Sequence, residues 1–239
     1  AQNQADSNSI INQSSNLNDK QKQALNDLIN HAQTKQQVAE IIAQANKLNN
    51  DMGTLKTFVE EQSKVHQQSK YINEDPQVQN IYNDSIQKGQ EILNGTTDDV
   101  LNNNKIADAI QNIQLTKNDL HGEQKLQKAQ QDANNELNYL TNLNNSQRQS
   151  EHDEINSAPS RTEVSNDLNH AKALNEVMRQ LENEVALENS VKKLSDFINE
   201  DEAAQNEYST ALQKAKDIIN GVPTSTIDKA TIEGALLDL

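Results

Sequence analysis

Residues 45–59, ANKLNNDMGTLKTFV, decide the fold because their apolar side chains recur at spacings of three and four. The pattern returns in residues 171–185, AKALNEVMRQLENEV, at an offset of 171 − 45 = 126. The apolar residues shared by the two stretches are Ala45, Leu48, Met52, Leu55 and Val59, matched by Ala171, Leu174, Met178, Leu181 and Val185. A three-four spacing that is kept while the residues between it change is typical of a buried helix face. We therefore predict a structural seam of core residues along two long helices.

The same offset relates the two halves of the chain without any insertion. Ile72-Asn73-Glu74-Asp75 recurs as Ile198-Asn199-Glu200-Asp201, and Asn94-Gly95 recurs as Asn220-Gly221. A repeat of this length holds several helices rather than a single helical hairpin. The chain also opens and closes inside expected helices, so we expect it to be a piece of a longer array.

Composition narrows both the fold and the classes of partner. Of the 239 residues, 33% are hydrophobic and 3% aromatic, so the sequence predicts several narrow cores rather than one wide interior. Six glycines and three prolines leave few helix breakers. A net charge of -15 disfavours nucleic acid and anionic lipid, and the absence of Cys excludes disulfides and thiolate metal sites. No apolar run is long enough to cross a bilayer.

Start and stop signals recur with the repeat. Thr34 with Gln37, and Ser160 with Glu163, fit a capping box, and Asn18 with Gln21 is a weaker version that Asn144 and Gln147 repeat. Gly95 and Gly221 are predicted helix stops because a left-handed residue commonly follows the end of a helix. Gly122 is expected to break or kink the chain.

These signals predict an all-α fold of tandem three-helix bundles that long shared helices join into an elongated rod. The expected helices lie near residues 3–15, 19–31, 35–72, 76–94, 98–120, 146–156, 161–198, 202–220 and 226–239. Leu126, Ala129, Ala133, Leu137 and Leu140 are expected to open the second copy. The helix over 35–72 would be about 55 Å long at 1.5 Å per residue and would serve two successive bundles.

Two stretches of the repeat resemble known modules. Leu28 to Thr34, followed by Val38, resembles the helix junction of the GA module, the albumin-binding three-helix unit of Gram-positive surface proteins. The stretch from Tyr71 through Tyr82 to Asn94-Gly95, ending at Leu120-His121-Gly122, looks like a FIVAR module. Their alternation is similar to the family of giant extracellular matrix-binding proteins of staphylococci. The expected modules are GA-like at 1–52 and 123–178, and FIVAR-like at 53–122 and 179–239.

The resemblance implies a non-enzymatic repeat unit of a bacterial cell-surface protein, associated with the cell wall or membrane. Implied partners are host matrix proteins such as fibronectin, neighbouring repeats of the same chain and, as an alternative, albumin; a role in envelope integrity is also implied. We expect a monomer without cofactors. The candidate protein-binding residues at the helix junction are His31, Gln33, Lys35 and Gln36. Where albumin-binding modules carry aromatic residues, this chain has Ala24 and Leu25, and Ser150 and Glu151.

The sequence gives little support for a metal-binding site. The five histidines form no HExxH motif and no pair at i, i+4, so surface histidine is favoured over a zinc site. His152-Asp153-Glu154 does not repeat and is interpreted as charged helix surface. Asp98-Asp99 is interpreted as two acids in the first turn of a helix rather than a cation site.

The aromatic residues leave two interpretations open. Tyr71 with its counterpart Phe197, and Tyr82 with Tyr208, either close the core of the second bundle or form a contact patch at the helix turn. An intracellular coiled-coil scaffold would need heptads sustained over many turns, and Asn94-Gly95 interrupts them.

Overall fold

The computed structural model describes the backbone from Gln2 to Leu239 and the side chains from Gln4 onward. Two compact units divide the chain, one reaching Glu123 and the other running from Gln124 to Leu239. The described residues form helices, turns and bends, without a strand. The predicted all-α class is confirmed for them, while Ala1, the first residue of the expected first module, lies outside them.

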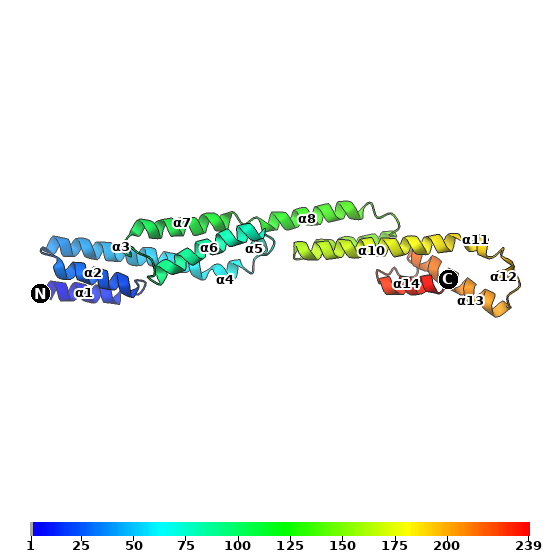
Figure 1. Ribbon diagram of the computed structural model, residues 1–239, viewed down its shortest axis with the longest axis horizontal. Coiled ribbons are helices and arrows are strands. Elements are labelled where there is room, and N and C mark those ends of the chain that lie inside the picture. Colours follow the sequence, from blue (N-terminus) through cyan, green and yellow to red (C-terminus); the bar gives the residue numbers. More distant parts are fainter. Residues whose placement is uncertain (1) are drawn as a thin grey trace. The chain divides into compact units, whose positions relative to one another are not determined.

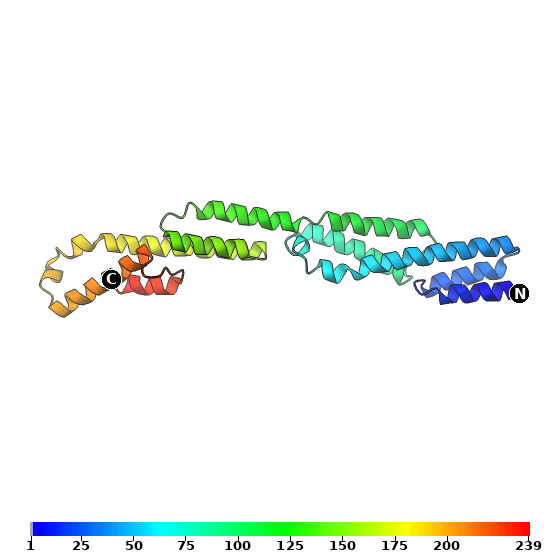
Figure 2. The same cartoon turned by 180° about the vertical axis from the view of Figure 1, so that it is seen from behind.

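Unit 1 is organised around one long helix. Its elements are α1 (Gln2–Gln13), α2 (Asp19–His31), α3 (Lys35–Glu60), α4 (Gln62–Val65), α5 (Ser69–Ile72), α6 (Pro76–Leu93) and α7 (Asn103–Asn118). Helix α3 packs against α1 and α2 and also against α6 and α7, as both views show (Figures 1 and 2). One hydrophobic core runs from Ile11 and Leu25 to Tyr82 and Ile113. The two expected bundles of this unit therefore share a core through α3.

Unit 2 repeats this order of elements. They are α8 (Gly122–Leu137, whose first two residues belong to unit 1), α9 (Asn145–Ser157), α10 (Arg161–Ala186), α11 (Glu188–Val191), α12 (Ser195–Ile198), α13 (Glu202–Asn220) and α14 (Lys229–Leu237). Helix α10 packs against α9, α13 and α14. Ala133 and Leu137 of α8 lie in the same core as Leu174 and Ile232.

The repeated seam forms the buried line of α3 and α10. Ala45, Leu48, Met52 and Leu55 are 0% exposed, and Val59 is 8% exposed. Ala171, Leu174, Met178 and Leu181 are equally buried, whereas Val185 is half-buried.

The predicted capping chemistry is largely confirmed. Complete capping boxes open α2, α3 and α9, in which the N-cap side chain and the Gln three residues later accept each other's backbone N–H. At α10 the Ser160 side chain accepts the N–H of Glu163, without the reciprocal bond. Each such cap stabilises its helix by about 1 kcal/mol. Gly95 and Gly221 have φ of 66° and 69°, the left-handed region in which glycine carries no steric penalty.

The long helices are shorter than the sequence predicted. The single helix expected over 35–72 is replaced by α3, α4 and α5, and the one over 161–198 by α10, α11 and α12. The chain leaves helical geometry at Gln68 and Leu194, where ψ is 144° and 143°. This bend folds Tyr71 back so that its ring stacks on His66 at 4.2 Å between centroids. Helix α3 has 26 residues and is therefore about 39 Å long.

One further expectation needs correction, and the structure decides between the two alternatives left open for Gly122. Asp98 and Asp99 are not in the first turn of a helix, because α7 begins at Asn103 behind an Asn102 N-cap, and Asp99 has a φ of 61°. Thr224 and Ser225, the equivalent residues, likewise precede the Asp228 N-cap of α14. The chain breaks before Gly122 rather than kinking within one helix, since α7 ends at Asn118.

Candidate interaction surfaces

The junction between α2 and α3 presents the predicted binding residues on the surface. His31, Gln33, Lys35 and Gln36 are all exposed. The His31 ring Nδ1 lies 2.7 Å from the Asp27 carbonyl oxygen. Their neighbours Leu28 and Ile41 line a shallow depression of about 420 Å³, together with His31, Ala32, Gln37, Glu40 and Gln44. The junction can therefore offer a partner a small apolar patch with a polar rim.

The equivalent junction in unit 2 has a different chemistry. Glu154 occupies the position of Leu28, and Asp167 occupies that of Ile41. Glu163 replaces Gln37. Three acidic residues thus stand where unit 1 has two apolar residues and a neutral amide. A ligand that needs the apolar patch of unit 1 would not find it in unit 2.

Two of the positions compared with albumin-binding aromatics are core positions. Leu25 is 0% exposed and Glu151 is 1% exposed, so neither can act as a surface anchor. Glu151 contacts the His170 ring at 2.9 Å through Oε1. Burial raises the pKa of Glu151, and the contact with His170 opposes that rise. Within the described part of the chain its other oxygen, Oε2, is buried without a hydrogen-bond partner.

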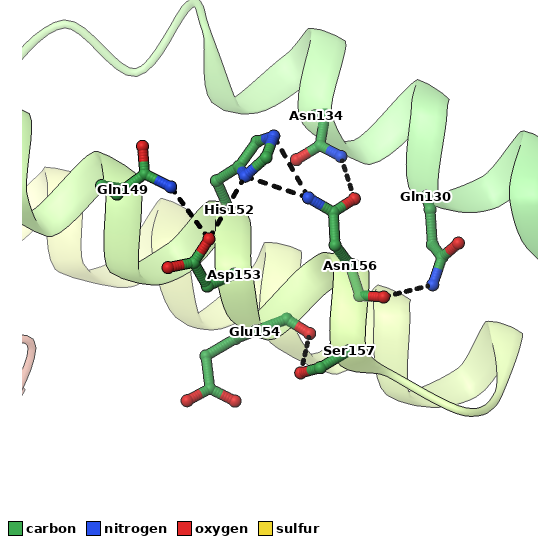
Figure 3. A network of polar contacts seen from close by, with 8 residues as sticks. All are labelled: Gln130, Asn134, Gln149, His152, Asp153, Glu154, Asn156 and Ser157. Atoms are coloured by element: carbon green, nitrogen blue, oxygen red, sulfur yellow. Dashed lines mark hydrogen bonds and ion pairs between the residues drawn. The ribbon is translucent and has the colours of Figure 1, made fainter.

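A polar network joins α8 to α9 around the predicted surface cluster at His152 (Figure 3). Asn156 donates toward the His152 ring at 3.0 Å, and Asn134 of α8 donates to the Asn156 side-chain oxygen at 2.8 Å. Gln130 donates to the backbone oxygen of Asn156 at 3.0 Å. His152 and Asp153 are exposed, so the network lies on the surface of the bundle. We name the bonds from Gln130 and Asn134 to Asn156 the brace.

The brace recurs in unit 1 with the same carboxamides. Asn8 donates to the Asn30 side-chain oxygen at 3.0 Å, and Gln4 donates to the Ile29 carbonyl at 3.2 Å. Gln4, Asn8 and Asn30 are identical to Gln130, Asn134 and Asn156 at the 126-residue offset. This brace was not predicted, although the matched carboxamides are visible in the repeat.

A second set of carboxamides ties the two modules of unit 1 together. Asn18, the N-cap of α2, donates to the Ile92 carbonyl in the last turn of α6 at 3.1 Å. Gln21, 1% exposed, accepts the Asn18 N–H at 3.0 Å and donates to the Val100 carbonyl at 3.0 Å. We name Asn18 and Gln21 the carboxamide bracket. An unpaired buried amide would cost about 1–3 kcal/mol, so these bonds favour one arrangement of the two modules.

Unit 2 carries the same bracket at Asn144 and Gln147. Asn144 donates to the Ile218 carbonyl at 3.3 Å, and Gln147 donates to the Thr226 carbonyl at 2.8 Å. The bracket also lies against the glycine stops, since a Cβ added to Gly95 would lie 3.1 Å from the Asn18 side chain. The same residues therefore cap a helix, fix a glycine turn and connect two modules.

The aromatic residues form a cluster at the far turn of unit 1. Tyr82 is 0% exposed, and its ring lies 6.1 Å from that of half-buried Tyr71. Burial raises the pKa of Tyr82 to about 12, and Glu61 adds to this effect. In unit 2 the Phe197 and Tyr208 rings lie 5.5 Å apart, with both residues half-buried. This geometry favours a core role for Tyr71 and Tyr82.

Among the residues that the structure describes, no group of three or more His, Asp or Glu side chains is placed to hold a metal ion. The helices described include none that combines the length and apolarity of a membrane span.

Comparison with known proteins gives matches along the chain. The GA module model matches residues 1–51 and 123–177, and the FIVAR domain model matches residues 51–121 and 177–239. The chain is 40% identical over 233 residues to the extracellular matrix-binding protein EbhA of Staphylococcus aureus strain N315 and to ebh of strain JH9. These alignments cover 98% of the chain but only 4% and 2% of the relatives.

Solved structures give further matches. A crystal structure of residues 756–1003 of Staphylococcus aureus EbhA superposes with a TM-score of 0.71 at 24% identity, covering 78% of this chain and 74% of that one. A second structure, described as concerning Embp-mediated adherence of Staphylococcus epidermidis to fibronectin, is 34% identical. It covers 50% of this chain and 95% of its own, with a TM-score of 0.47. The first likeness supports the fold.

Proposed function

Because this chain belongs to the family of extracellular matrix-binding proteins built from GA modules and FIVAR domains, we propose that it is a non-enzymatic spacer and adhesive repeat. Its modules divide near residues 52 and 178, inside α3 and α10. Repeats of this kind would extend from a bacterial surface and combine reach with weak binding to host matrix ligands. A contribution to envelope integrity belongs to the same proposal.

The mechanical part of the proposal is supported by the coupling of the modules within each unit. A helix with a buried seam crosses from the GA part to the FIVAR part, and the carboxamide bracket ties their loops. The shared helix and the carboxamide bracket are two separate connections, and together they resist bending between the modules more than a single linker would. They recur in unit 2, as expected for a mechanical element used many times.

The adhesive part is supported by the family name and by the surface of the α2–α3 junction. The patch there is small, so a single copy offers limited contact area. Affinity would then come from avidity, because linked weak sites act at high effective concentration. Fibronectin serves as the test ligand, since it is named for the Staphylococcus epidermidis protein.

Copy number is the variable that tests the adhesive part. Chains of one, two and four tandem copies would be compared on immobilised fibronectin by surface plasmon resonance. The proposal predicts slower dissociation with each added copy. Equal and negligible binding at every copy number would remove adhesion and leave the spacer.

Albumin is a second candidate ligand because Leu28 and Ile41 form an apolar depression at the GA junction of unit 1. Calorimetry would compare the wild-type chain with a variant carrying Leu28→Glu and Ile41→Asp, which copies the junction of unit 2. Micromolar binding that this variant abolishes would support albumin as a ligand. Binding unchanged in the variant, or absent from both chains, would reject this site.

A further inference from the structure

The tetrapeptide Ile-Asn-Glu-Asp occurs in both units but differs in burial. Asn73 and Glu74 are 2% and 5% exposed in unit 1. Asn199 and Glu200, the identical residues of unit 2, are exposed. The difference must come from what packs on the motif, because the motif itself does not change.

The segment that opens α8 covers the motif in unit 1. The Glu74 carboxylate accepts the backbone N–H of His121, the residue before the first helical residue Gly122, across 47 positions of sequence. Its other oxygen accepts the N–H of Asp75 at 2.8 Å. In the capping boxes of α2, α3 and α9 a local Gln accepts the equivalent N–H. Glu74 therefore caps the N-terminus of α8 from a distant part of the chain, whereas those glutamines cap their own helices. It also places a negative charge at the positive end of the helix dipole.

Gly122 permits this contact. A Cβ added there would lie 2.5 Å from the Lys70 carbonyl oxygen and 2.7 Å from the Glu74 nitrogen and the Ser69 carbonyl oxygen. All three are backbone atoms, which cannot rotate away as a side chain can. The docked segment therefore needs glycine, and the surface that it contacts is largely the backbone of the turn at Ser69–Glu74.

Unit 2 holds the same turn in the same conformation. The residue before α12, Leu194, has a ψ of 143°, against 144° for Gln68. The residue after it, Asn199, has φ and ψ of −95° and 0°, against −95° and 6° for Asn73. The backbone of this turn is thus already formed in unit 2, while Glu200 is exposed.

We propose that the turn over Ser195–Ile198, with Asn199 and Glu200, is a docking surface for the opening segment of a further repeat. The occupant is a Leu-His-Gly turn followed by a helix, of the kind found at Leu120-His121-Gly122. Glu200 accepts the N–H that precedes the new helix, and the glycine lies against the backbone of α12. This assigns the contact between successive repeats, goes beyond the proposed adhesive function and does not depend on the identity of any ligand.

The present chain provides a matched pair of variants. Glu74→Ala removes an acceptor in use, whereas Glu200→Ala removes one that is exposed. Amide hydrogen exchange resolved by NMR should accelerate about tenfold or more at His121 and its neighbours for Glu74→Ala, because a buried bond to a charged group is lost. Glu200→Ala should change exchange in unit 2 less than twofold. Equal effects of the two variants would overturn the proposal.

An extended chain tests the surface of unit 2 directly. Joining a copy of residues 114–138 after Leu239 continues the 126-residue register and supplies an opening segment of the proposed kind. In this chain the amides of Asn199 and Glu200 should gain protection, and Glu200→Ala should now have the effect that Glu74→Ala has in unit 1. Replacing the glycine of the added Leu-His-Gly by Val is the matched control and should abolish the gain.

Three results would contradict the proposal. The added segment could exchange like an unfolded peptide, or the Val control could protect Asn199 and Glu200 as well as glycine does. Protection of these two amides that rises with concentration in the unextended chain would make a second copy of the chain the occupant instead.

Discussion

The two units are built on one pattern, yet they differ in how completely that pattern is covered by other residues. In unit 1 Tyr82, Asn73 and Glu74 are buried, and Val65 is 2% exposed. In unit 2 the equivalent Tyr208 and Val191 are half-buried. The seam and the carboxamide bracket are nevertheless the same in both. The part that joins GA to FIVAR is therefore complete within each unit, whereas the far end of the FIVAR part is buried in unit 1 and exposed at Asn199 and Glu200 in unit 2.

A second difference lies inside the GA cores. Unit 1 places Leu25 where unit 2 places Glu151, and both are almost fully buried. At this core position unit 1 has an aliphatic side chain and unit 2 has a carboxyl group, which is less favourable to bury. We therefore expect the position to stabilise unit 2 less than it stabilises unit 1. The predictions that follow test how far the two units behave alike, beginning with the largest expected effect.

Met52→Asp should destabilise unit 1 by about 3–5 kcal/mol, because it buries an unpaired charge in the seam. Both modules of the unit should lose structure together, since the seam serves both. Met178→Asp is the matched variant for unit 2. Circular dichroism with residue-resolved NMR would measure the loss; a folded FIVAR part beside an unfolded GA part would show that the modules are independent.

Gln21→Leu should destabilise unit 1 by about 2–3 kcal/mol, because it leaves the Asn18 N–H and the Val100 carbonyl without their partner. Gln147→Leu should cost unit 2 a similar amount, since its bonds are equivalent. Urea unfolding monitored in each unit would give both values. Gln23→Leu, at an exposed position of the same helix, is the control and should change stability little.

Glu151→Leu should stabilise unit 2 by about 1–3 kcal/mol, because it copies Leu25 and removes a buried carboxylate with one unbonded oxygen. Thermal unfolding would measure the gain. Glu154→Leu, which copies the exposed Leu28, is the control and should have little effect. A loss of stability in Glu151→Leu would mean that the contact with His170 outweighs the burial of the charge.

The same substitution has a defined pH dependence. The pKa of Glu151 is raised in the folded state, so protonation of this group stabilises the folded wild-type protein relative to the unfolded chain. That contribution is lost as pH rises from the ordinary Glu pKa of about 4.3 through the raised value. The advantage of Glu151→Leu over the wild-type protein should therefore grow across this window and then level off. A constant difference between the two proteins would contradict the assignment.

Ala215→Gly should destabilise unit 2 by about 1 kcal/mol or slightly more, through the backbone entropy of glycine and the loss of a buried methyl group. The reverse change, Gly89→Ala, should gain less than this. Its Cβ would lie 3.0 Å from the Val59 side chain and 3.1 Å from that of Ile113, which offsets the helix propensity. Chemical denaturation of both variants would show the asymmetry, and equal and opposite effects would contradict it.

The sequence predicted those features that depend on local chemistry or on the repeat. The seam from Ala45 to Val59 follows from helical spacing, and the caps at Asn18 and Thr34 follow from side-chain type. Gly89 and Gly53 lie inside α6 and α3, and their counterparts Ala215 and Arg179 show that neither position requires glycine. Comparing two copies gave this information without any other sequence.

Features set by tertiary contacts could not be predicted in this way. The bend at Gln68 brings Tyr71 against His66 and Tyr82, and these contacts form only in the folded chain. The exposed His31, Gln33, Lys35 and Gln36 stay predicted binding residues, because a surface site depends on its partner as well as on the fold. Burial of Leu25 depends on the phase of α2 against α3, and burial of Glu151 on that of α9 against α10, which composition does not reveal.

Native-state hydrogen exchange along α3 tests the coupling of the two modules most directly. Amides from Ala45 to Val59 should exchange with one common opening free energy, equal to that of global unfolding of unit 1, and the same should hold from Ala171 to Val185 in unit 2. Two separate opening energies, with a weakly protected stretch at Met52, would show a hinge between modules and contradict the account.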